Sequence, residues 1–69
     1  MIKLALVGLG KMGISHLAIL RAHPDVELVA ACDGLRYLTH GLEKFSGLNC
    51  YNDFDEMLRQ EDLDGIVID

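Results

Sequence analysis

The strongest constraint on the fold is a glycine motif, G-x-G-x-x-G, at residues 8–13. It directly follows an apolar run at residues 2–7 and leads directly into a helical pattern of apolar residues. In a turn of this kind Gly8 lets the chain reverse tightly, Gly10 lets backbone approach a pyrophosphate, and Gly13 lets helix and strand pack closely. The motif in this context predicts a dinucleotide-binding turn between a buried strand and a helix.

The residues around this turn predict how a dinucleotide is held. The helix that begins here points unpaired N–H groups and the positive end of its dipole at the loop, which favours an anion without a cationic side chain. Asp33 ends a second apolar run twenty residues after Gly13, where an acidic residue binds the ribose hydroxyls. Its charge favours NAD over NADP, whereas Arg36 leaves NADP use open. The expected cofactor-binding residues are Gly8, Leu9, Gly10, Lys11, Met12, Gly13, Asp33 and Arg36.

Several of these residues also have a purely structural interpretation. The glycines could form a tight turn without a ligand, and Asp33 could simply end a strand. Lys11 suits a solvated loop charge better than a phosphate ligand. His16, one turn into the helix, is interpreted as a packing or hydrogen-bonding residue, so no catalytic residue is assigned. The acidic cluster at residues 53–56 is explained by helix capping, and no metal site is expected.

Apolar periodicity predicts alternating strands and helices along the whole chain. The expected strands are residues 2–7, 26–32, 48–51 and 66–68. Right-handed crossovers between them imply an α/β fold with a parallel, doubly wound sheet of Rossmann type. The expected strand order is 3-2-1-4. In such a sheet the cofactor crevice lies at the carboxyl ends of the strands, where the winding direction reverses.

The ends of the intervening helices are marked by specific residues. Pro24 stops the first helix and Gly47 stops the second. Asp53 is expected to cap the third helix. The buried face of that third helix is expected to consist of Phe54, Met57 and Leu58.

Charge and composition exclude several classes of partner. The net charge is −5 and the six basic residues are scattered, which argues against a nucleic-acid or anionic-membrane surface. No run approaches the roughly 18 to 20 apolar residues of a membrane span, and the first residues do not resemble a signal peptide. Cys32 and Cys50 lack the paired spacing of a zinc site and are interpreted as reduced thiols. The chain is therefore expected to be cytoplasmic.

Four strings carry a more specific signal: LVGLGKMGISH at residues 6–16, CD at 32–33, YNDFDEML at 51–58 and DLDGIVI at 62–68. With these in place, the whole chain resembles the N-terminal part of the glucose-fructose oxidoreductase, inositol dehydrogenase and rhizopine-catabolism family (Gfo/Idh/MocA). The resemblance implies an NAD(P)-dependent oxidoreductase acting on a CH–OH group of a sugar, cyclitol or related polyol. It also implies a homo-oligomeric parent protein with a larger C-terminal substrate domain.

The chain departs from the family pattern after its fourth strand. The family continues there with Ala-Thr-Pro and later a Glu-Lys-Pro motif whose lysine acts in proton transfer, whereas this chain ends at Asp69. The string EKF at residues 43–45 lies in the second predicted helix and lacks the proline. Residues 1–69 are thus expected to form the N-terminal part of an NAD(P)-binding domain that is inactive alone. The alternatives are a non-catalytic, nucleotide-binding regulatory module and a fragment that binds nothing.

Overall fold

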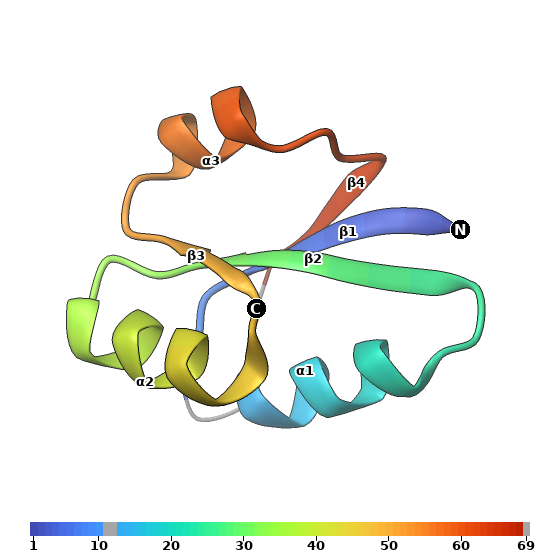
Figure 1. The fold of residues 1–69 in the computed structure, drawn as a ribbon, viewed down its shortest axis with the longest axis horizontal. Helices are drawn as coiled ribbons and strands as arrows, with labels where there is room; N and C mark the ends of the chain where they lie inside the picture. The colour runs from blue at the N-terminus through green and yellow to red at the C-terminus, as the bar shows by residue number, and fades with distance from the viewer. Residues whose placement is uncertain (11–12, 69) are drawn as a thin grey trace.

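Strands and helices alternate along the chain, as the apolar periodicity predicts (Figure 1). The computed structural model describes residues 1–10 and 13–68. The third strand begins one residue later than expected and the fourth one residue earlier. The elements are β1 (Ile2–Val7), α1 (Gly13–Ala22), β2 (Val26–Cys32), α2 (Arg36–Ser46), β3 (Asn49–Tyr51), α3 (Phe54–Gln60) and β4 (Gly65–Ile68).

The four strands form one parallel sheet in the order β3-β2-β1-β4, which confirms the predicted fold class and strand order. β1 lies between β2 and β4, and this central position explains its nearly continuous apolar sequence. Val7 pairs with Cys32 of β2 and with Ile68 of β4, and Cys32 pairs in turn with Tyr51 of β3. The carboxyl ends of all four strands therefore lie along one edge of the sheet.

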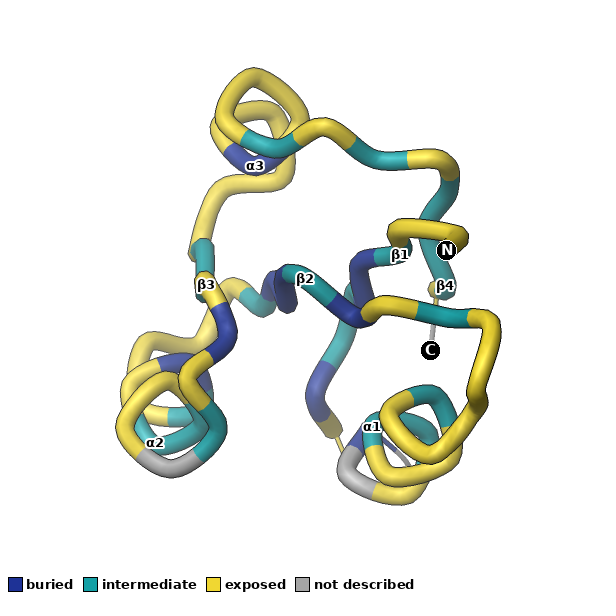
Figure 2. Tube along the Cα trace, turned by 45° about the vertical axis from the view of Figure 1, so that its right-hand side comes forward, coloured by how far each residue is buried: buried dark blue, intermediate teal, exposed yellow. Residues whose placement is uncertain are grey.

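Helices cover both faces of the sheet (Figures 1 and 2). α1 and α2 lie on one face, and α3 is the one helix of residues 1–10 and 13–68 that lies on the other. Successive residues of a strand point to opposite faces, so Ala5 packs on the α3 side while Leu6 packs on the side of α1 and α2. The larger core, on the side of α1 and α2, contains Leu6, Leu9, Leu28, Ala31 and Leu48.

α3 buries less of its apolar surface than the sequence predicts. Met57 is 0% exposed, but Phe54 and Leu58 are 38% and 47% exposed, so their predicted burial is wrong. The helix has seven residues, and no other helix in the described part of the chain lies on its face of the sheet. Phe54 and Leu58 lie about 60° and 100° around the helix from Met57, on a flank that the sheet does not cover.

The predicted helix ends are confirmed. Asp53 Oδ1 accepts hydrogen bonds from the backbone N–H groups of Asp55 (2.9 Å) and Glu56 (3.2 Å) at the start of α3. Gly47 ends α2 in the left-handed conformation, with φ at 74°, and its N–H donates to the carbonyl of Glu43.

The two cysteines are free thiols on opposite sides of the sheet. Cys32 is buried on the α3 side, and burial together with the carboxylates of Asp33 and Asp53 raises its pKa. Burial and the nearby Glu43 raise the pKa of Cys50 to about 11. Both thiols therefore stay protonated at neutral pH.

Across residues 1–10 and 13–68, we find no helix with the length and apolar character to cross a bilayer.

Candidate functional site

The glycine loop lies directly beyond the carboxyl end of β1. Gly8 has a φ of 98°, a conformation that favours glycine, and its N–H donates to the carbonyl of Cys32 at 2.8 Å. Leu9 turns inward and packs in the core between sheet and helices. Gly13 begins α1 and donates its N–H to the carbonyl of Gly10 at 2.9 Å. The loop is thus attached to β2 on one side and to α1 on the other.

Gly10 differs from Gly8 because the protein itself does not require a glycine there. Its backbone φ lies outside the left-handed region, and a Cβ added to it would meet no atom within 4 Å. The residue is exposed at the carboxyl edge of the sheet. An open glycine at this place suits the close approach of a ligand to the backbone, as a pyrophosphate requires.

Asp33 lies beside the glycine loop, although it is 24 residues from Leu9 along the chain. Its Oδ2 accepts the backbone N–H of Leu9 at 2.7 Å, and its Oδ1 accepts the N–H of Leu35 at 2.8 Å. Each carboxylate oxygen has two lone pairs, so each keeps one for a further donor. The two oxygens together can accept both hydroxyls of a vicinal diol.

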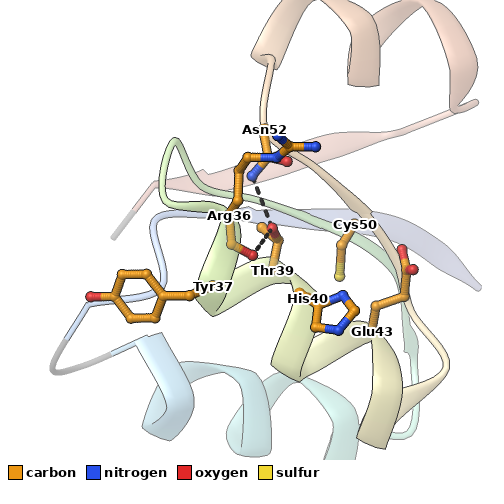
Figure 3. Close-up of a pocket in the computed structure, with 7 residues that line it drawn as sticks. All are labelled: Arg36, Tyr37, Thr39, His40, Glu43, Cys50 and Asn52. Carbon is orange, nitrogen blue, oxygen red and sulfur yellow. Dashed lines mark hydrogen bonds between the residues drawn. The ribbon is translucent and has the colours of Figure 1, made fainter.

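Arg36 occupies a different position from the other predicted residues. It is the exposed first residue of α2 and borders a cavity of about 420 Å³ between α2 and β3. In Figure 3, Arg36 and Asn52 lie at one end of this cavity, whereas His40 and Glu43 lie at the other. Lys11 and Met12 lie outside the described residues. The structure thus brings together Gly8, Leu9, Gly10, Gly13 and Asp33, with Arg36 three residues beyond Asp33.

Two polar residues that the sequence analysis did not assign to the site contact the backbone of Asp33 and its neighbours. The Asn52 side-chain amide donates to the carbonyl of Asp33 and to Thr39 Oγ1, both at 2.8 Å. The Thr39 hydroxyl donates to the carbonyl of Arg36 at 3.1 Å, and Figure 3 shows both hydrogen bonds of Thr39. Two signals pointed to them: Asn52 directly follows a strand at the carboxyl edge, and Thr39 is a polar residue among the apolar positions of α2.

A glycine loop and an acidic residue, joined at the carboxyl edge of a parallel sheet, define a dinucleotide-binding domain of Rossmann type. The model of the Gfo/Idh/MocA family, an oxidoreductase family with an NAD-binding Rossmann fold, matches residues 2–69. The chain belongs to this family, and NAD is the cofactor of its domain.

Solved structures with the same fold include several dehydrogenases. The WlbA dehydrogenase from Bordetella pertussis, in complex with NADH and UDP-GlcNAcA, is 29% identical with a TM-score of 0.88 and aligns with 97% of this chain and 21% of its own. A myo-inositol dehydrogenase from Corynebacterium glutamicum is 36% identical (TM-score 0.84, 97% of this chain, 20% of that one). Scyllo-inositol dehydrogenase from Lactobacillus casei, with NAD(H) and scyllo-inositol, is 29% identical (TM-score 0.83, 97% and 20%).

The chain spans about a fifth of the length of these structures. A search of curated proteins finds no match.

Proposed function

We propose that residues 1–69 form the N-terminal part of the NAD-binding domain of a dehydrogenase, and that a longer parent chain supplies the substrate domain. The proposed reaction is the oxidation or reduction of a CH–OH group in a sugar, cyclitol or related polyol. The main support is the 2.7 Å contact between the Leu9 N–H and Asp33, because it joins the two parts of a dinucleotide site. The inositol dehydrogenases among the structural relatives support the class of substrate.

In this proposal the pyrophosphate is held by backbone at residues 8–10 and by the N-terminus of α1. α1 has ten residues and no acidic residue in its first turn, so no carboxylate there opposes an anion. The aligned peptide dipoles place about half a positive charge at this end of the helix. Phosphate binding therefore needs no lysine or arginine side chain.

Asp33 is proposed to bind the adenine ribose of NAD. The two free acceptor positions on its carboxylate match the two hydroxyl donors of the ribose diol. A 2′-phosphate would meet the negative charge of Asp33, so NAD is favoured over NADP. Arg36 is close enough in sequence to serve a 2′-phosphate instead, and weak NADP binding is the second expected outcome.

When bound, NAD supplies the hydride acceptor or, reduced, the hydride donor. The described residues position this group and assign no acid or base to the reaction. We propose that the proton-transfer group and the polyol site belong to the parent chain, so that residues 1–69 alone bind dinucleotide without turnover.

The test is a calorimetric titration with NADH and NADPH of the chain, of Gly10→Val and of Gly41→Val. Gly41 lies in α2, and a Cβ there also meets no atom within 4 Å, so the control adds the same side chain at an equally open glycine. Gly10→Val is expected to abolish binding and Gly41→Val to retain it. A folded Gly10→Val variant that binds NADH as tightly as the unmodified chain would contradict the proposed site. For the reaction, the parent chain is assayed for NADH formation with a panel of sugars and inositols.

A further inference from the structure

We propose that Asn52 and Thr39 form a clamp that positions Asp33 for ribose binding, an inference that rests on the proposed function. The clamp joins the turn after β3 to the end of β2 and to the first turn of α2. Neither residue is proposed to touch the cofactor. Both act through the backbone that carries the Asp33 carboxylate.

The Asn52 side chain uses both of its amide hydrogens in this clamp. One goes to the carbonyl of Asp33 and the other to Thr39 Oγ1, each at 2.8 Å. If the amide were turned over, its oxygen would face the Asp33 carbonyl oxygen, and two acceptors would oppose each other. The hydrogen bonds therefore select one orientation of the amide.

Thr39 gives the clamp a fixed base. Its side chain is 5% exposed, and its hydroxyl both donates to the carbonyl of Arg36 and accepts from Asn52. A buried hydroxyl with a single rotor can satisfy both bonds only in one position. The first turn of α2 is thereby tied to Asn52.

The backbone of Asp33 is consequently held on both sides of its Cα atom. Its N–H donates to the carbonyl of Tyr51 at 3.0 Å, and its carbonyl accepts from Asn52. The side chain that leaves this Cα is the one that reaches the Leu9 and Leu35 N–H groups. Loss of the clamp should make the Asp33 carboxylate more mobile, and a more mobile carboxylate should bind a ribose diol less tightly.

A role in stability alone makes a different prediction from a role in positioning. If the clamp acts through Asp33, Asn52→Ala weakens NADH binding in the unmodified chain but has no further effect in Asp33→Ala. If the clamp only stabilises the fold, Asn52→Ala lowers NADH affinity by the same factor in the unmodified chain and in Asp33→Ala. A double-mutant cycle on NADH affinity therefore separates the two roles.

The experiment compares Asn52→Ala, Thr39→Val and Thr39→Ser with Asn49→Ala, by titration with NADH and NADPH. Asn49 is a matched control on β3, because its amide donates to Glu61 at 3.0 Å and not to the Asp33 turn. Asn52→Ala and Thr39→Val are expected to weaken NADH binding about fivefold, which corresponds to about 1 kcal/mol. Both should also narrow the preference for NADH over NADPH. Thr39→Ser keeps the hydroxyl, so it should bind NADH more tightly than Thr39→Val does. Asn49→Ala should bind NADH as tightly as the unmodified chain.

Amide hydrogen exchange gives a second readout without cofactor. The Leu9 N–H, which donates to Asp33, should exchange faster in Thr39→Val, whereas the Lys3 N–H, which donates to Asp64 at 2.8 Å, should not change. Thr39→Val keeps the side-chain volume, so this arm holds even if Asn52→Ala fails to fold. Unchanged NADH affinity and Leu9 exchange in the folded variants would overturn the clamp alone. A chain that binds no NADH at all would overturn the proposed function and the clamp with it.

Discussion

At each end of β1 an aspartate carboxylate accepts a hydrogen bond from a backbone N–H group, and the two hydrogen bonds have almost the same length. At the amino end, Asp64 Oδ2 accepts the N–H of Lys3 at 2.8 Å. Just beyond the carboxyl end, Asp33 Oδ2 accepts the N–H of Leu9 at 2.7 Å. In both cases the carboxylate comes from a neighbouring part of the sheet and replaces a bond that the strand ladder does not supply.

Their surroundings differ. Asp64 returns a second bond from its own N–H to the carbonyl of Lys3, which closes the contact into a pair. Asp33 instead lies beside an exposed glycine whose Cβ position is open. In an open parallel sheet, ligands bind outside the carboxyl ends of the strands. The location of such a carboxylate, more than the bond it makes, therefore distinguishes a binding residue from a structural one.

The largest expected difference between the two aspartates is in cofactor affinity. Asp33→Ala removes an ionised acceptor of the ribose hydroxyls, and hydrogen bonds of that kind contribute about 1.5–3 kcal/mol, or roughly 10- to 100-fold in NADH affinity. The preference for NADH over NADPH should narrow as well. Asp64→Ala should leave both affinities within about twofold. Calorimetric titration measures all four values, and an unchanged NADH to NADPH ratio in Asp33→Ala would rule out the ribose assignment.

Without cofactor, the two aspartates are expected to make similar contributions to the stability of the fold. Asp33→Ala removes a carboxylate from the N–H groups of Leu9 and Leu35, and Asp64→Ala removes one from the N–H of Lys3. Each is expected to lower the free energy of unfolding by about 1–2 kcal/mol, with Asp33→Ala at the upper end. Urea denaturation measures this loss. Saturating NADH should then stabilise Asp64→Ala and the unmodified chain alike, but Asp33→Ala much less, because ligand stabilisation depends on the dissociation constant. Equal stabilisation of both variants by NADH would mean that the two ends of β1 do not differ in function.

Sequence patterns predicted the fold well because each element carries a local signal and the glycine motif indicates the type of sheet. The apolar run at residues 2–7 identified the central strand, and the dinucleotide-binding turn that follows it favoured the Rossmann-type order 3-2-1-4. Leu48 marks the limit of this reasoning. Its apolar side chain suggested a strand residue, but its N–H donates to Ser46 Oγ at 3.2 Å and β3 begins one residue later.

The candidate site was only partly predictable. The glycines and Asp33 could be read from the sequence because a dinucleotide turn requires particular residues at a fixed spacing. The contact of Asn52 with Thr39 and Asp33 could not, since it depends on the register that sets Tyr51 opposite Cys32. Only that pairing brings the residue after β3 to the turn after β2.

Two glycines, one at each end of the sheet, are expected to differ in the same way but with a smaller effect. A Cβ at Gly65, at the amino end of β4, would lie 3.2 Å from Leu4 Cδ2, whereas a Cβ at Gly10 would meet nothing. Gly65→Ala should lower stability by less than about 1 kcal/mol, because the end of a leucine side chain can shift, and should not change NADH affinity. Gly10→Ala should leave stability unchanged or raise it by up to about 1 kcal/mol, because alanine restricts the unfolded chain.

Gly10→Ala is nevertheless expected to weaken NADH binding. Gly65→Ala should thus lower stability without changing NADH affinity, whereas Gly10→Ala should lower NADH affinity without lowering stability. Thermal unfolding and NADH titration of the same samples provide the measurement. If Gly65→Ala weakened NADH binding as much as Gly10→Ala does, the separation of a structural and a binding end would be wrong.

The smallest change is expected in stability at alkaline pH, and it comes from Tyr51, the last residue of β3. Its phenol donates to the carboxylate of Glu61, and this hydrogen bond, followed by burial, raises its pKa from 10.0 to about 12. Because the folded state keeps a proton that the unfolded chain loses, the contribution to stability is complete below pH 10 and disappears as the pH rises toward 12.

Tyr51→Phe should therefore be less stable than the unmodified chain by a constant amount below pH 10, and the difference should shrink between pH 10 and 12. Urea unfolding at a series of pH values measures this difference. The substitution leaves the Tyr51 carbonyl, which accepts the N–H of Asp33, in place. NADH affinity at neutral pH should consequently not change, since the phenol contacts Glu61 and not the Asp33 turn. A loss of NADH affinity in Tyr51→Phe would show that the binding end of the sheet extends to the side chains of β3.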